Sequence, residues 1–182
     1  MIGLRRGTLE LSPYDPGWPV FFESEKRRIE QAIGRVILAV EHVGSTAVIG
    51  LPAKPIIDIA IALRDYEDGF QCVAPLAELG YLYKGEHGIA GRHFFRTNGE
   101  QVKVHIHMTA MSHPEWRNHL AFRDFLRSHP DAARQYAALK HELKATCGAD
   151  REKYTEAKAG FIASVLRKAG ATGEGPRDVD LA

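Results

Sequence analysis

The sequence predicts an α+β fold in which a first helix is followed by a mixed sheet and then by a helical C-terminal third. Apolar residues recur at helical spacing over residues 17–33, whereas residues 36–43 and 56–63 are rich in β-branched and apolar types, as strands are. Residues 92–108 have the chemistry of a β-hairpin. Three further helical patterns follow, at about 114–127, 131–146 and 150–169.

Capping and turn residues set the boundaries of these elements. Asp15 can cap the first helix and Gly34 can end it, while the Gly44-Ser45-Thr46 turn ends the first strand. We expect a short helix over residues 68–79 and an edge strand over residues 81–86 between the second strand and the hairpin.

The length of 182 residues is that of one ordinary domain, and we expect a single domain over residues 1–170. The segment 171–182 lacks the apolar residues needed for packing, so it is predicted to be a disordered tail. The composition is that of a soluble globular protein, with 45% hydrophobic and 26% charged residues and no apolar run long enough to span a membrane.

The charge balance and the cysteines narrow the functional classes. The chain has 24 Lys and Arg against 23 Asp and Glu, so no global field favours a nucleic acid as an obligatory partner. Cys72 and Cys147 are too few for a disulfide framework and are expected to be buried thiols. Because the first residues lack the apolar core of a secretory signal, we expect a cytoplasmic protein.

Asp58 is a single acid in an otherwise apolar strand. Side chains alternate along a strand, so Asp58 and Ala60 face one side of the sheet, while Ile57, Ile59 and Ile61 face the other. A buried carboxylate costs several kcal/mol unless something compensates its charge. Asp58 therefore needs a metal ion or hydrogen-bond donors; capping a helix or pairing with an arginine would serve equally.

The predicted hairpin carries two histidines on one face. If Asn98-Gly99 is its two-residue turn, Phe94 lies opposite Lys103 and Arg92 lies opposite His105. The predicted polar face then holds Arg92, Arg96, Lys103, His105 and His107.

This polar face can bind polyphosphate through its cations and a divalent metal through neutral imidazoles. Solvated histidines on an outer sheet face would explain the His105-x-His107 pattern without any function. His93 falls on the apolar face, opposite Val104, and is expected to be a satisfied core histidine. His119 falls in a helix and is expected at the surface or a cap.

The turn after the first strand is a candidate phosphate site. Backbone N–H groups and hydroxyls at Gly44, Ser45 and Thr46, together with Lys54 in the next connection, can bind phosphate oxygens. His42 precedes this turn and is a candidate general base or supporting partner. Most Gly-Ser pairs are plain turns, and this one gains weight because Asp58 follows on the next strand.

These residues together resemble a known family. The strings Glu41-His-Val-Gly-Ser-Thr-Ala-Val48, Gly50-Leu-x-Ala-Lys-Pro-x-x-Asp-Ile59 and His105-x-His107 look like the GrpB family, within the polymerase-beta-type nucleotidyltransferase superfamily. The resemblance spans roughly residues 10–169. It implies a nucleotidyltransferase core with a mixed, mostly antiparallel sheet, helices packed on one side and a helical C-terminal third.

The resemblance also implies a chemistry, from which the sequence departs. In that superfamily a Gly-Ser turn holds nucleotide phosphates, and three acids on strands bind two magnesium ions; Ser45 and Asp58 match two of these positions. Ala60 stands where a second acid is expected, and His105 and His107 stand near the third. One carboxylate and two imidazoles suit zinc, manganese, cobalt or iron better than magnesium, and we expect one divalent metal from among manganese, zinc and magnesium.

Three hypotheses follow from these residues, of which metal-dependent hydrolysis at the Asp and His cluster is disfavoured by the phosphate-type turn at Ser45. The first is a metal-dependent nucleotidyl or phosphoryl transferase, with a nucleoside triphosphate as co-substrate and a small molecule as acceptor. In it, Asp58 and His42 are catalytic, and Asp58, His105 and His107 bind the metal. The phosphate ligands are Gly44, Ser45, Thr46, Lys54, Arg92, Arg96 and Lys103. The second hypothesis is a catalytically inactive binding or folding module on the same scaffold, with a protein partner.

Overall fold

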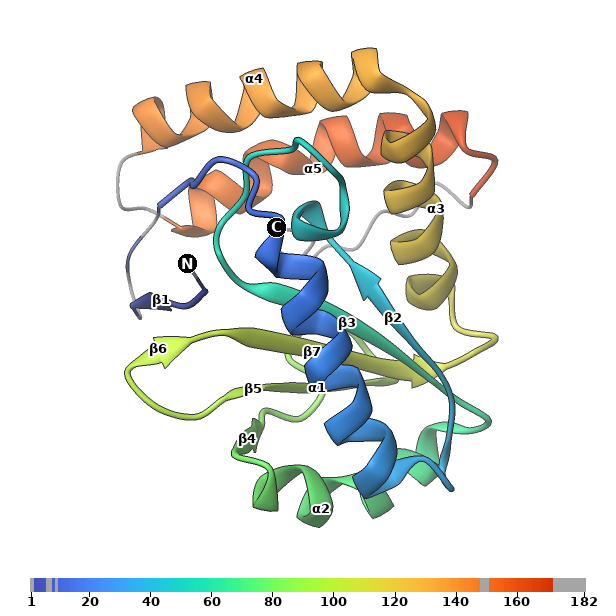
Figure 1. Cartoon of the computed structure of the whole chain (residues 1–182). Coiled ribbons are helices and arrows are strands. Elements are labelled where there is room, and N and C mark those ends of the chain that lie inside the picture. The colour runs from blue at the N-terminus through green and yellow to red at the C-terminus, as the bar shows by residue number, and fades with distance from the viewer. Residues whose placement is uncertain (1, 6–7, 9, 148–150, 172–182) are drawn as a thin grey trace.

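The computed structural model describes residues 2–5, 8, 10–147 and 151–171. Figure 1 shows the predicted order of a first helix, a mixed sheet and a helical C-terminal third. Apart from Ala171, the predicted tail lies outside the described residues.

The elements are β1 (Leu4–Arg5), α1 (Gly17–Ile33), β2 (Ile37–Val43), the 3-10 helix η1 (Ser45–Ala47), β3 (Ile57–Leu63), the 3-10 helix η2 (Tyr66–Cys72), α2 (Val73–Glu78), β4 (Tyr81–Tyr83), β5 (Arg92–Thr97), β6 (Gln101–Val102), β7 (Val104–Ala110), α3 (Pro114–Ser128), α4 (Pro130–Cys147) and α5 (Arg151–Lys168).

The main sheet has five strands in the order β2-β3-β7-β5-β4. The central pair β3–β7 is parallel, and the other three pairs are antiparallel. The mixed, mostly antiparallel sheet is thus confirmed. A second sheet pairs β1 with β6, which the sequence did not predict.

The two faces of the sheet have different coverings. Ile57, Ile59 and Ile61 face α1 and join the main hydrophobic core, and Figure 1 shows α1 lying across the sheet. On the opposite face, Trp116 of α3 packs against Ala60 and other small side chains. The helices α3, α4 and α5 also pack on one another, around Phe122, Leu126, Tyr136, Ile162, Val165 and Leu166. Asp58 therefore lies between the sheet and the helical third.

The register of the hairpin differs from the predicted one. Arg92 lies opposite Thr109 and Phe94 opposite His107, so β5 is displaced by four residues along β7. Asn98-Gly99 does not form the two-residue turn, because Arg96 lies opposite His105 and the intervening residues 101–102 pair with β1 instead. Thr97 closes the longer loop by accepting a hydrogen bond from the Lys103 amide at 2.8 Å. An even displacement keeps each side chain on its predicted face.

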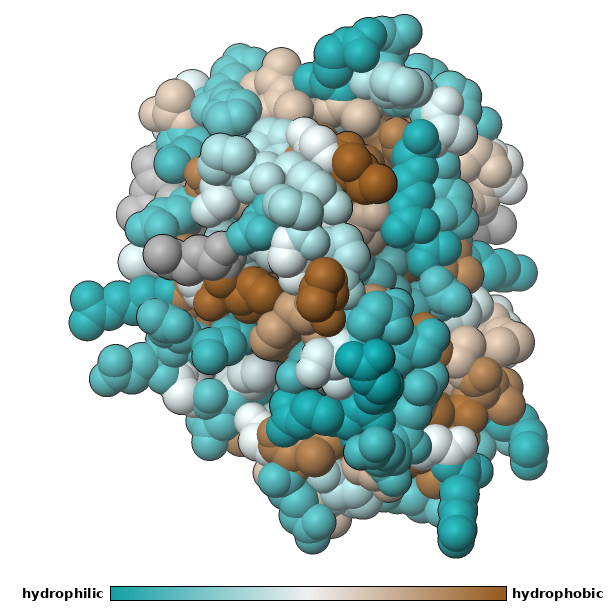
Figure 2. Space-filling model, in the orientation of Figure 1, coloured by the Kyte–Doolittle hydropathy of each residue, from teal (hydrophilic) through white to brown (hydrophobic). Residues whose placement is uncertain are grey.

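Among the described residues, no helix is both long enough and apolar enough to cross a bilayer. The face shown in Figure 2 is mostly hydrophilic, with separate apolar patches, and the exposed apolar side chains include Val20 and Ile49. Cys72 is buried, as predicted, and burial raises its pKa to about 11. Cys147 is partly exposed, because α4 lies on the outside of the helical third, so the expectation of two buried thiols is corrected.

Candidate functional site

A carboxylate and two imidazoles meet on adjacent strands. The parallel register pairs Asp58 with His105 and Ala60 with His107, which places all three polar side chains on the face away from the isoleucines. His105 Nδ1 lies 3.4 Å and His107 Nε2 lies 3.6 Å from Asp58 Oδ1. All three residues are buried. The structure thus brings together the three residues that the sequence predicts as metal ligands.

The polar atoms of this cluster are poorly satisfied. Neither carboxylate oxygen of Asp58, nor His107 Nε2, has a hydrogen-bond partner within the part of the chain that the structure describes. Buried polar atoms in proteins are normally paired, so a convergent unpaired set fits a cation. One ligand atom from each residue lies within 4.8 Å of the others. The donor set of one carboxylate and two imidazoles fits manganese or zinc.

Electrostatics hold the cluster together without a metal. Burial raises the pKa of Asp58, but His105 and His107 outweigh it and hold the pKa below its ordinary value. Burial lowers the pKa of His107, but Asp58 and Glu115 outweigh it and raise the pKa to about 9. At neutral pH the proton on His107 therefore provides the positive charge that a metal would otherwise supply.

A second carboxylate stands behind His107. Glu115 Oε1 lies 3.7 Å from His107 Nδ1 and 3.3 Å from His119 Nε2, and all three side chains are buried. A carboxylate on the far nitrogen of a ligating histidine fixes its tautomer and orientation. His119 is thus not at the surface, which corrects the prediction. The i, i+4 spacing of Glu115 and His119 placed them on one helix face, but nothing local showed that this face docks on the sheet.

Arg92 completes this arrangement instead of facing a phosphate. Its guanidinium is fully buried and donates to Glu115 Oε1 at 3.0 Å, with His107 Nδ1 at 3.4 Å. It also donates to the carbonyl oxygen of His87 at 2.6 Å. The register displacement put Arg92 opposite Thr109, beyond both histidines, so its predicted role in phosphate binding is replaced by an internal ion pair.

The turn after β2 lies directly on the metal-type cluster, which consists of Asp58, His105 and His107. Gly44 has φ +70°, and a β-carbon at this position would lie 2.5 Å from Asp58 Oδ2. Glycine is therefore required both by the backbone conformation and by the close approach. Ser45 and Thr46 follow in η1 and are fully buried. The candidate phosphate turn and the candidate metal ligand are thus in contact.

One buried lysine contacts Ser45, and two more lie beside the Tyr154 ring. Lys140 of α4 donates from Nζ to Ser45 Oγ at 3.0 Å, and also to the Pro52 carbonyl oxygen. Burial, aided by the charge of Lys54, lowers the pKa of Lys140 to about 7. The Nζ atoms of Lys54 and Lys158 lie 5.8 and 4.6 Å from the centre of the Tyr154 ring.

An anion at Ser45 would relieve this repulsion between neighbouring ammonium groups. Lys54 was a predicted phosphate ligand, whereas Lys140 and Lys158 lie far along the chain. No local signal pairs them with Ser45.

The remaining candidates separate into three places. His42 pairs with Ile59, so it lies on the opposite sheet face from Asp58, and its Nε2 contacts Thr46 Oγ1 at 3.0 Å. Arg96 lies opposite His105 and shares its face. Lys103 is exposed in the loop before β7 and leaves the predicted polar face.

His93 matches the prediction of a satisfied core histidine. It is fully buried, and its ring nitrogens contact the Tyr66 carbonyl oxygen at 2.9 Å and the Tyr83 hydroxyl at 2.8 Å. Its strand partner is Met108 rather than the predicted Val104, because of the register displacement.

Solved structures place the fold. The chain is similar to the conserved protein GrpB from Enterococcus faecalis, with a TM-score of 0.82 and 33% identity over 88% of this chain and 96% of that one. It also resembles terminal uridylyl transferase 4 from Trypanosoma brucei with bound dUTP, with a TM-score of 0.55 and 10% identity over 93% of this chain and 59% of that one. The core is therefore a nucleotidyltransferase fold.

Sequence comparisons place the family. The chain is 38% identical over 154 residues to the UPF0157 protein YqkA of Bacillus subtilis, which covers 85% of this chain and 45% of that protein. The chain thus spans under half of the length of that relative. The GrpB protein family model matches residues 8–168. The chain belongs to the GrpB protein family.

Proposed function

We propose that this protein is a metal-dependent nucleotidyl or phosphoryl transferase acting on a small-molecule acceptor. The observation that carries the proposal is the position of the Asp58 carboxylate. It contacts the Gly44 turn on one side and the His105–His107 pair on the other, while neither oxygen has a hydrogen-bond partner among the described residues. The proposed metal ligand and the proposed phosphate turn are thus adjacent.

The side chains divide into two groups with complementary tasks. Asp58, His105 and His107 would hold a divalent cation, manganese or zinc by the donor set, which supplies Lewis-acid activation of a phosphoryl oxygen. Arg92 and Glu115 keep His107 oriented with Nε2 toward Asp58. The second group consists of Ser45, Thr46, Lys54, Lys140 and Lys158, which would bind the phosphates of a nucleoside triphosphate.

The second group would bind the phosphates that leave in nucleotidyl transfer. In that reaction an acceptor oxygen forms a bond to the α-phosphorus, the bond to pyrophosphate breaks, and the proton of the acceptor hydroxyl passes to water. Ser45 and Lys140 would compensate the charge that develops on the leaving pyrophosphate. His42 lies on the other face of the sheet, so its proposed role is to hold the turn through Thr46 rather than to accept the proton of the acceptor.

A second candidate is a binding or folding module that does no chemistry. It is favoured by the complete burial of Ser45 and Asp58 and by Ala60 at the position of a second acid. A transferase on this fold needs a nucleotide to reach its phosphate turn, whereas a module does not. The two candidates therefore differ in whether any nucleotide binds.

The test is thermal unfolding of the metal-stripped chain with each nucleoside triphosphate and magnesium, manganese or zinc. A ligand that binds only the folded state raises the unfolding midpoint by mass action. We expect one nucleotide–metal pair to stabilise the wild type but neither Asp58→Asn nor Lys140→Met. That nucleotide then enters a pyrophosphate-release assay with small-molecule acceptors.

The control is Asp68→Asn. It removes a carboxylate from η2, which follows the C-terminal end of β3, whereas the turn at Ser45 lies beside the N-terminal end of that strand. It should respond to nucleotide as the wild type does. If no nucleotide shifts the folded wild type, the transferase is excluded and the second candidate takes its place. If Asp58→Asn responds fully, the site lies elsewhere.

A further inference from the structure

The structure contains a cavity that the proposed transferase does not use. Its volume is about 790 Å³, within the range of small-molecule sites. It lies at the free edge of β2, between α1 on one side and the end of α3 and the start of α4 on the other. Neither Asp58 nor the His105–His107 pair lines it. Ala47 of η1 lines it, whereas Ser45 and Thr46 do not.

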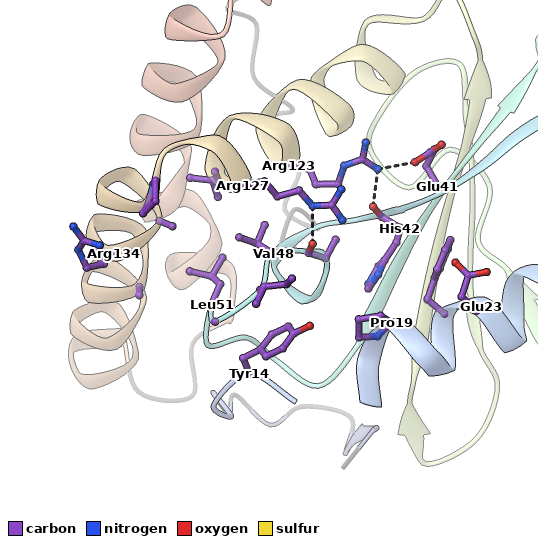
Figure 3. Close-up of a pocket in the computed structure, with 18 of the residues that line it drawn as sticks. Tyr14, Pro19, Glu23, Glu41, His42, Val48, Leu51, Arg123, Arg127 and Arg134 are labelled. Atoms are coloured by element: carbon purple, nitrogen blue, oxygen red, sulfur yellow. Dashed lines mark hydrogen bonds and ion pairs between the residues drawn. The ribbon is translucent and has the colours of Figure 1, made fainter. Parts of the chain in front are cut away.

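Two guanidinium groups form the polar side of this cavity. Arg123 donates to Glu41 at 2.7 Å and to the carbonyl oxygen of His42 at 3.0 Å. Arg127, one helical turn later, donates from Nε to the Ala47 carbonyl oxygen at 3.0 Å. These bonds fix the position of each guanidinium. Figure 3 shows both arginines on the same side of the cavity.

The positive potential at this place is reflected in the titrating groups. Burial, followed by the charge of Arg123, lowers the pKa of Arg127. Burial lowers the pKa of His42 to about 4 and both arginines act in the same direction, while Asp58 opposes them. His42 is therefore neutral at physiological pH. Burial lowers the pKa of Arg123, but Asp124 and Glu41 outweigh it and raise the pKa, so Arg127 is the guanidinium whose charge an added anion would mainly compensate.

The other walls are apolar and aromatic. Phe22 stacks on the His42 ring, with centroids 4.7 Å apart and planes at 13°. Tyr14, Val48 and Leu51 also line the cavity, and Figure 3 shows Tyr14 across it from the arginines. These walls can cover a flat or branched apolar group, while the guanidinium groups contact a charged head.

The acids of the cavity limit the charge of a ligand. Glu41 and Asp124 already compensate Arg123, each at 2.7 Å, and Glu23 also lines the cavity. The contact of Arg127 with Asp124 is long, at 3.7 Å, and both side chains are about half exposed, so it is a weak competitor. The excess positive charge thus suits one anionic head group, and a triphosphate would meet the two glutamates.

We propose that this cavity binds a small amphipathic anion, with one carboxylate or phosphate monoester head and an aromatic or branched apolar body. The head contacts Arg127 and Arg123, and the body lies against Phe22, Tyr14 and Leu51. The site is independent of the metal cluster and of transfer chemistry. Its ligand is distinguished from a nucleoside triphosphate by its single head group and apolar body.

The test is calorimetric titration of the full, metal-stripped chain with four matched probes. These are 3-phenylpropionate, 2-phenylethyl phosphate, 3-phenylpropanol and 3-phenylpropylamine. We expect at least one anion to bind about tenfold or more tightly than the alcohol, and the amine to bind most weakly. The relative affinities of the carboxylate and the phosphate identify the head group. Equal binding of alcohol and anions, or no binding of either anion at millimolar concentration, overturns the proposal.

Two pairs of variants locate the site. Arg127→Gln should lower the affinity for the anionic probe about tenfold or more. Arg117→Gln, at an exposed position on the same helix, should leave that affinity unchanged. Ala133→Phe fills the cavity and should abolish binding, whereas Ala138→Phe adds the same ring to an exposed position of α4. Unaltered binding to folded Ala133→Phe would show that the probes sit elsewhere and would overturn the proposal.

Discussion

Gly44 and Asp58 are in such close contact that a β-carbon on Gly44 would lie 2.5 Å from Asp58 Oδ2. The backbone of the phosphate turn thus forms one wall of the metal-type cluster. Any change in one of these elements is transmitted directly to the other, because neither a main chain nor a buried carboxylate can move aside at little cost.

Gly44→Ala should therefore damage both stability and metal binding. The substitution combines a strained φ of +70° with a steric overlap, and we expect a loss of about 2–3 kcal/mol in the free energy of unfolding. Urea unfolding and a metal titration measure the two effects. Gly50→Ala is the matched control, because Gly50 has φ +80° but no atom within 4 Å of the added methyl. It should lose about 1 kcal/mol and keep its metal affinity. Equal effects of the two variants would contradict the contact.

Metal binding at neutral pH should release about one proton. In the metal-free protein, the carboxylates of Asp58 and Glu115 raise the pKa of His107 to about 9, so His107 is protonated at pH 7.5, and a metal can bind only its neutral ring. Calorimetry of zinc or manganese binding in buffers of different ionisation enthalpy measures the proton count. His107→Asn should abolish this release along with most of the affinity. A release near zero in the wild type would show that His107 is not a ligand.

Glu115→Gln should weaken metal binding by about 10–100-fold without removing any ligand atom. The carboxylate holds His107 through Nδ1 together with Arg92, and an amide cannot provide the same charge. The d–d spectrum of the cobalt-substituted protein reports the ligand geometry directly. Glu142→Gln removes the same charge from the exposed face of α4 and should change neither spectrum nor affinity. An unchanged spectrum and affinity in Glu115→Gln would exclude the positioning role.

Anion binding at Ser45 should weaken as the pH rises through about 7. Burial and Lys54 lower the pKa of Lys140 to about 7, so the free protein loses this positive charge above that pH, and binding an anion there requires proton uptake. Above pH 7 the dissociation constant of inorganic pyrophosphate should rise by up to about tenfold per pH unit. Lys140→Arg should flatten the profile because arginine keeps its charge. A flat profile in the wild type would place the anion away from Lys140.

Lys103→Ala and Lys158→Ala should differ in their effect on nucleotide affinity. The predicted two-residue turn would have aligned Lys103 with the histidines, but the observed register leaves it exposed in a loop. Lys158, from α5, is buried beside Tyr154. Thermal shifts with nucleotide should match the wild type in Lys103→Ala and fall in Lys158→Ala. A fall in Lys103→Ala with no change in Lys158→Ala would instead support the predicted hairpin register, in which Lys103 lies beside the histidines.

Several features could be predicted from sequence because they depend on local periodicity. Strand alternation placed Asp58, His105 and His107 on polar faces, and an even register displacement could not change those faces. The run from residue 37 to the turn at Ser45 and the helices of the C-terminal third follow from patterns within about 20 residues. The resemblance to the GrpB family rests on the same local strings.

Tertiary structure alone decided which distant residues join these local elements. The hairpin has a register that its turn residues do not encode, and β6 pairs with β1, about 100 residues away in the sequence. The docking of α3 on the sheet brought Glu115 to His107, and the docking of α4 brought Lys140 to Ser45. Helix periodicity tells which face of a helix is apolar, but the partner of that face is selected by packing over the whole core. The composition of the site beyond Asp58, Ser45 and the two histidines was therefore set by the fold.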